Sequence, residues 1–127
     1  MSLSAGKKKV LVVEDLEDNR DFIQQVLSGE YDLIFASDGR MGVAMAKAKR
    51  PDLIIMDLNL PILDGWEATR ILRSDPGLFN TPIIALTAYT LDSDYMRAME
   101  AGCTDFLNKP IMPADLRSKV KEHLAVQ

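Results

Sequence analysis

PDLIIMDLNLPILDGWEATRIL, residues 51–72, is the stretch that decides the fold. It contains a short apolar run, Leu53–Met56, of the kind that forms a strand buried on both faces. Asp57 ends that run, and Asp64 followed by Glu67 has the capping-box spacing that starts a helix. The stretch therefore predicts a strand, a short loop and a helix, with an aspartate at the carboxyl end of the strand.

The same unit recurs along the whole chain. Segments with the apolar spacing of helices separate the apolar runs, and Gly102 and Pro113 suit a helix end and a helix start. The other runs are Val10–Val13, Leu33–Ala36, Ile83–Leu86 and a weaker one at Phe106–Leu107. Five such units predict an α/β fold, a doubly wound five-stranded parallel sheet with strand order 2-1-3-4-5.

Length and composition limit the classes of function. The 127 residues, 47% hydrophobic and 27% charged, fit one globular domain, which we place at residues 8–127; residues 1–7 are expected to be disordered or vector-derived. A net charge of -4 gives no basic footprint, so direct contact with nucleic acid is not expected. No apolar stretch approaches the roughly 20 residues that cross a bilayer. A single cysteine, Cys103, and no signal segment at the start predict a cytoplasmic protein.

Polar side chains stand where the predicted strands end. Glu14 and Asp15 follow the first strand, Asp57 the third, Thr87 the fourth and Lys109 the fifth. Ligands of open α/β sheets bind outside the carboxyl ends of the strands, and the predicted order makes strands one and three neighbours. Three carboxylates would then share one pocket. Such a cluster either takes up a proton or binds a hard cation, and Mg²⁺ is the cation that we expect.

This set of side chains suits phosphoryl transfer. With its oxygens neutralised, a phosphoryl group can be attacked directly by the Asp57 carboxylate. Lys109 would supply a second positive charge, and the Thr87 hydroxyl could donate a hydrogen bond to a phosphoryl oxygen. The expected product is an aspartyl phosphate.

Four ordered motifs resemble the response-regulator receiver family, whose fold is flavodoxin-like, (βα)5. They are VLVVEDLEDNR (10–20), MDLNLPILDG (56–65), ALTAY (85–89) and GCTDFLNKP (102–110). The resemblance implies that Asp57 accepts phosphate from a histidine kinase or histidine phosphotransferase. It also implies that Asp15 and Asp57 ligate Mg²⁺ with the Asn59 carbonyl, that Glu14 acts mostly through water, and that Lys109 pairs with the phosphoryl group before a cis Pro110.

The resemblance further implies a switch. Thr87 and Phe106 would be the switch pair that reshapes the face formed by the fourth helix, fifth strand and fifth helix for a downstream protein target. The sequence departs from the common pattern in two switch-related places: Phe106 replaces a frequent tyrosine and so lacks a hydroxyl, and a bulky Tyr89 stands near the pocket mouth. We hypothesise that Tyr89 shields the acyl phosphate from water.

Several alternatives stay open at this point. The chain could act alone or be the receiver of a larger hybrid kinase or regulator, and it could pair with itself through its last two helices. It is not expected to be an enzyme beyond catalysing its own phosphorylation and dephosphorylation. An aspartate-nucleophile phosphatase would carry a second aspartate at the position of Asn59, and a phosphate-independent scaffold would not need the acid and lysine set. His123 is expected to be solvated.

Overall fold

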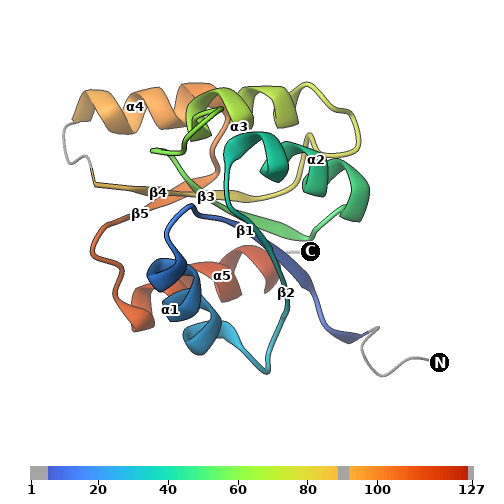
Figure 1. Ribbon diagram of the computed structural model, residues 1–127, viewed down its shortest axis with the longest axis vertical. Helices are drawn as coiled ribbons and strands as arrows, with labels where there is room; N and C mark the ends of the chain where they lie inside the picture. The colour runs from blue at the N-terminus through green and yellow to red at the C-terminus, as the bar shows by residue number, and fades with distance from the viewer. Residues whose placement is uncertain (1–5, 89–91, 126–127) are drawn as a thin grey trace.

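The computed structural model describes residues 6–88 and 92–125, in which strands and helices alternate along the chain (Figure 1). The strands are β1 (Lys9–Val13), β2 (Asp32–Ala36), β3 (Leu53–Asp57), β4 (Ile83–Thr87) and β5 (Asp105–Asn108). The helices are α1 (Glu17–Leu27), α2 (Gly39–Lys49), α3 (Gly65–Arg73), α4 (Asp92–Ala101) and α5 (Pro113–Ala125). All five predicted strands are confirmed, each slightly longer than its apolar run. No described helix is long and apolar enough to span a bilayer.

The strands form one parallel sheet in the predicted order, β2-β1-β3-β4-β5. In the pairing of β1 with β3, Val13 lies opposite Met56. The residues that come next, Glu14 and Asp57, therefore lie side by side at the carboxyl ends of β1 and β3. This register is what brings the carboxylates of two separate motifs to the same place.

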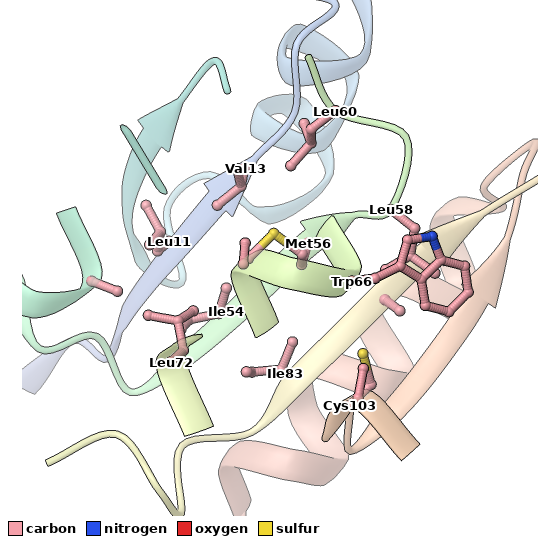
Figure 2. Packing of buried hydrophobic residues seen from close by; sticks show 14 of the residues in the cluster. Leu11, Val13, Ile54, Met56, Leu58, Leu60, Trp66, Leu72, Ile83 and Cys103 are labelled. Carbon is pink, nitrogen blue, oxygen red and sulfur yellow. The ribbon is translucent and has the colours of Figure 1, made fainter. Parts of the chain in front are cut away.

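Helices cover both faces of the sheet, with α1 and α5 on one side and α2, α3 and α4 on the other (Figure 1). Side chains of a strand alternate between faces, and β3 shows this directly. Leu53 and Ile55 pack in the cluster under α1 and α5, whereas Ile54 and Met56 pack in the cluster under α2, α3 and α4. Figure 2 shows the second cluster, where Trp66 of α3 closes one end. Burial on both faces explains why the strands are continuous apolar runs.

The predicted helix boundaries are confirmed in most details. The Asp64 carboxylate accepts a hydrogen bond from the Glu67 amide at 2.9 Å and so caps α3. The Glu67 carboxylate does not complete a capping box but lies 3.3 Å from Arg70 Nη1. Gly102, directly after α4, has φ 112°, and α5 begins at Pro113. The Lys109–Pro110 peptide bond is cis, as the resemblance implies.

The start of α3 packs directly against the backbone that carries Asp57. A Cβ at Gly65 would overlap the carbonyl oxygen of Asp57 and lie 2.7 Å from the Cα of Leu58. Because both obstacles are backbone, neither can move aside cheaply. Gly65 is therefore required by close approach, and it fixes the distance between α3 and the end of β3.

Replacing Gly65 with alanine should lower the free energy of unfolding by about 3 kcal/mol, because the added methyl group overpacks a rigid contact. Urea unfolding followed by circular dichroism measures the change. Gly6→Ala is the matched control, since a Cβ there meets no atom within 4 Å. An unchanged urea midpoint for Gly65→Ala would contradict the packing described here.

Candidate functional site

Three carboxylates meet at the carboxyl ends of β1 and β3. Oxygen atoms of Glu14, Asp15 and Asp57 all lie within 4.8 Å of one another. Glu14 and Asp57 are almost completely buried, with 0% and 1% of their surface exposed, and Asp15 is partly exposed. The predicted meeting of these side chains is confirmed, and its direct cause is the β1–β3 register.

Lys109 supplies the positive charge of this cluster. Its Nζ atom donates to Asp57 Oδ2 at 2.9 Å and lies 3.5 Å from Glu14 Oε1. Burial alone would lower the pKa of Lys109, but the hydrogen bond and charge of Asp57, together with the charge of Glu14, outweigh it and raise the pKa. Lys109 is therefore a fixed cation, and its backbone amide is held at the end of β4 by the carbonyl of Thr87, 2.8 Å away.

One carboxylate oxygen of Glu14 is buried without a hydrogen-bond partner among the described residues. Its Oε2 accepts from the Leu16 amide at 3.1 Å, whereas Oε1 has no hydrogen-bond partner among the described residues, although Lys109 is close enough for an ion pair. Burial, and then the charge of Asp57, raise the pKa of Glu14 to about 7. That Glu14 acts on a metal mostly through water stays a prediction. A buried, unsatisfied carboxylate oxygen beside two further acids is a donor set that fits a hard cation.

The raised pKa of Glu14 predicts how stability changes with pH. Between its ordinary pKa of 4.5 and the folded value of about 7, the folded protein keeps a proton that the unfolded chain has released. The free energy of unfolding of the metal-free protein should therefore fall by up to about 3 kcal/mol as pH rises through this interval. Glu14→Gln cannot titrate and should lose this dependence.

Urea unfolding at pH 4.5, 6 and 7.5 in the presence of EDTA measures this effect in both proteins. Asp38→Asn offers a control, because Asn retains the capping bond to the Met41 amide and lies outside the cluster. Parallel pH profiles for the wild type and Glu14→Gln would show that Glu14 is not the group responsible.

The phosphoacceptor candidate Asp57 is held at both carboxylate oxygens. Asn59 donates its backbone amide to Oδ1 at 3.0 Å, while Lys109 occupies Oδ2. The backbone amide of the intervening Leu58 donates to the Leu86 carbonyl of β4 at 3.0 Å, which extends the β3–β4 hydrogen bonding past Asp57. Asn59 therefore lies beside the site, as predicted, and the role of its carbonyl as a metal ligand stays a prediction.

The proposed switch residues lie on the neighbouring strands. Thr87 is the last residue of β4, is buried, and pairs in register with Asn108 of β5. Phe106 pairs with Ala85 and is half-buried against the cluster beneath α2, α3 and α4. Both positions fit the predicted switch, which the structure does not test. Tyr89, the subject of the shielding hypothesis, lies outside the described residues.

Three contacts, one at the carboxylate cluster and two on β5, were not predicted. Arg20 Nη1 donates to the Glu14 carbonyl at 2.8 Å and ties the loop after β1 to α1. The sequence offers one indication of this contact, namely that Arg20 belongs to the first motif. On β5, Asp105 Oδ2 lies 2.9 Å from both Lys119 Nζ and His123 Nε2, so the expectation of a solvated His123 is wrong. Packing of α5 across β5 brings these residues together although they are far apart in the sequence.

The contacts with His123 and Lys119 also affect the charge state of Asp105 on β5. Burial would raise the pKa of Asp105, but hydrogen bonds from His123, Lys119 and the Phe106 amide outweigh it and lower the pKa. Asp105 is thus a stable anion directly before Phe106. A groove of about 530 Å³ is lined by residues of β5, of α5 and of the loop between them, among them Phe106 and Lys119.

Comparison with known proteins supports one family. The model for the response regulator receiver domain matches residues 10–121. The alkaline phosphatase synthesis transcriptional regulatory protein PhoP of Bacillus subtilis is 39% identical over 90% of this chain, which spans 47% of that protein. The polar-differentiation response regulator DivK of Brucella anthropi is 34% identical over 92% of this chain and 96% of its own length.

A solved structure adds information on the metal. The receiver domain of sensor histidine kinase PA1611 from Pseudomonas aeruginosa is 36% identical to this chain, with a TM-score of 0.87. The match covers 94% of this chain and 99% of the PA1611 receiver domain. It was crystallised with a magnesium ion coordinated in its active-site cleft. The relatives therefore include both nearly full-length matches and receivers that form part of longer proteins.

Proposed function

The chain belongs to the response regulator receiver family of two-component signalling, and from this premise we propose that Asp57 is its phosphoryl-accepting residue. The observation that carries the proposal is the position of Lys109 Nζ, 2.9 Å from the buried Asp57 carboxylate and within ion-pair range of Glu14. A fixed cation against a cluster of acids marks the place where a phosphoryl group can be received.

The cluster fits a resident Mg²⁺. We propose that Asp15 and Asp57 hold it, together with the Asn59 carbonyl, and that Glu14 contributes through water. Bound there, Mg²⁺ would neutralise charge on the phosphoryl oxygens. The unsatisfied Oε1 of Glu14 and the short separation of the three carboxylates support this assignment. Cation binding should also release the proton that Glu14 retains near neutral pH.

The reaction needs little from the protein beyond position and charge. An Asp57 carboxylate oxygen forms a bond to phosphorus while the P–N bond of a phosphohistidine donor breaks, and the electron pair of that bond stays on the imidazole nitrogen. Lys109 Nζ, freed from the carboxylate, pairs with a phosphoryl oxygen. The Thr87 hydroxyl donates to another. The donor would be a histidine kinase or histidine phosphotransferase.

Phosphorylation would be read out on the face of α4, β5 and α5. Movement of Thr87 toward the phosphoryl group would open room at the end of β4, and Phe106 on the adjacent strand would turn inward to fill it. Since Phe106 has no hydroxyl, burial of its ring is the only driving force. A protein target, or a second copy of the chain, would bind the altered face.

Amide NMR tests metal, site and switch together. Adding Mg²⁺ to the metal-free protein should shift amides at 14–16 and 57–59, and adding beryllofluoride, a phosphoryl mimic, should then shift those of Thr87 and Phe106. Glu67→Gln, on the exposed side of α3, is a control that should give the same shifts. An absence of Mg²⁺-dependent shifts at 14–16 and 57–59 would refute the proposed site.

A further inference from the structure

A second group of metal-ligating side chains lies between β5 and α5. One ligand atom each of Asp105, Glu122 and His123 lies within 4.8 Å of the other two. We call these three residues the β5–α5 triad. Asp105 begins β5, four residues before Lys109, and that length of strand spans roughly 13 Å. The triad is therefore separate from the carboxylate cluster, and the proposed function makes no use of it.

The spacing of the triad suits one small ion. His123 Nε2 lies 2.9 Å from Asp105 Oδ2 and 3.8 Å from Glu122 Oε2. Ligand atoms around a tetrahedral ion with bonds of about 2.0–2.2 Å lie roughly 3.4 Å apart. The two observed distances fall on either side of this value, and the exposed Glu122 side chain can adjust to it. Small side-chain rotations would therefore seat an ion, with water as a fourth ligand.

Asp105 already has the orientation and charge of a metal ligand. Its Oδ1 accepts a hydrogen bond from the Phe106 amide at 2.8 Å, whereas Oδ2 lies next to His123 and Lys119 of α5. A hydrogen bond to the oxygen that does not bind the ion fixes the direction of a ligating carboxylate. The contacts with His123, Lys119 and the Phe106 amide lower the pKa of Asp105, so no proton has to leave before an ion binds.

Lys119 shows that this place attracts a cation. Its Nζ donates to Asp105 Oδ2 at 2.9 Å, and it lies one helical turn before His123. An ammonium group brings one positive charge and cannot bind the imidazole nitrogen. A divalent ion brings two charges and can bind all three ligands of the triad. The Lys119 side chain is partly exposed and can extend into solvent when such an ion takes its place.

The ligand types select the class of ion. Mg²⁺ prefers six oxygen ligands in an octahedron, whereas an imidazole nitrogen combined with carboxylate oxygens suits Zn²⁺ and similar transition metals. We propose that the β5–α5 triad is a second metal site, which binds Zn²⁺ or a similar divalent transition-metal ion in place of the Lys119 ammonium. The bound ion joins α5 to β5 directly before Phe106. This site goes beyond the proposed function and does not depend on it.

His123 makes the site measurable, because it is the single histidine of the chain. Its ring protons therefore give unambiguous signals in a proton NMR spectrum. In protein saturated with Mg²⁺, added Zn²⁺ should shift these ring signals and the amide of Phe106 along the same binding curve. Amides at 57–59 report separately on any Zn²⁺ that enters the carboxylate cluster.

Substitutions separate ligands from the competing lysine. His123→Gln keeps a donor for Asp105 but removes the imidazole, and Zn²⁺ affinity, now followed at the Phe106 amide, should fall about tenfold or more. Glu122→Gln should also weaken binding. Lys119→Met should raise the affinity severalfold, because the ammonium no longer occupies Asp105 Oδ2.

Asp115→Asn is the matched control for Glu122→Gln. It makes the same change of charge on an exposed residue of α5, two helical turns before the triad, and should leave the affinity unchanged. Histidine ring signals that do not move, or that move only in a large excess of Zn²⁺, would mean adventitious binding and overturn the proposal. Equal affinities of Glu122→Gln and Asp115→Asn, or no gain in Lys119→Met, would also overturn it. Labelling of Asp57 is a separate result that none of these outcomes affects.

Discussion

Replacing Asp57 with asparagine should abolish phosphoryl uptake from acetyl phosphate or phosphoramidate. The amide keeps the shape of the side chain and can still accept from the Asn59 amide, but it lacks the nucleophilic oxygen charge that attacks phosphorus. Mg²⁺ affinity should fall as well, because one of three clustered carboxylates is lost. Incorporation of labelled phosphate and a Mg²⁺ titration measure the two effects.

The same substitution should stabilise the metal-free protein. Asp57 and Glu14 are both buried, and within the described part of the chain they share the one positive partner Lys109. Removing one of the two negative charges should therefore raise the free energy of unfolding by about 1 kcal/mol at pH 7.5. Asp64→Asn is a suitable control, since asparagine also caps α3 and the residue lies in the same loop. Undiminished uptake by Asp57→Asn would place the phosphoacceptor elsewhere.

Replacing Lys109 with methionine should slow phosphoryl uptake by about 100-fold or more, because a fixed charge that would meet the phosphoryl oxygens is removed. Metal binding should change in the opposite direction. Lys109 Nζ lies 2.9 Å from Asp57 Oδ2, where it competes with a cation for the same carboxylate. Mg²⁺ affinity should therefore rise severalfold, and isothermal titration calorimetry measures it.

Loss of Lys109 should also reduce stability by about 2 kcal/mol at pH 8 in the absence of Mg²⁺, because two buried acids remain without a cation. At pH 5 the loss should be smaller, since Glu14 is then protonated. Lys119→Met removes a comparable lysine that pairs with Asp105 on α5, away from the carboxylate cluster, and should leave phosphoryl uptake close to the wild type. A Lys109→Met protein with normal uptake would contradict the role given to this residue.

The sequence predicts the sheet well because strands that are buried on both faces consist of consecutive apolar residues. The central strands β1, β3 and β4 are continuous apolar runs, each closed or followed at once by a polar residue, and parallel order then places Glu14 and Asp57 together. The sequence also predicts two helix boundaries correctly: Asp64 caps the start of α3, and Gly102, whose φ is 112°, follows the end of α4. These features depend on neighbours in the chain or on strand register.

Features that depend on three-dimensional packing were missed or predicted wrongly. Burial of Glu14 is a property of the folded loop after β1, where the Leu16 amide donates to the Glu14 carboxylate and Arg20 donates to the Glu14 carbonyl. The contact between His123 and Asp105 depends on where α5 crosses β5. The left-handed Ile62 could not be foreseen, because its residue type argues against that conformation and only the packing around it imposes it.

Peptide mass spectrometry of the protein treated with phosphoramidate tests the central claim most directly. With Mg²⁺ present, the peptide that contains Asp57 should gain about 80 Da, the mass of one phosphoryl group, in a form that hydroxylamine removes. Chelation of Mg²⁺ with EDTA should prevent the gain. An unmodified Asp57 peptide, a phosphoryl group on another residue, or labelling that persists in EDTA would contradict a Mg²⁺-dependent aspartyl phosphate at the mouth of the sheet.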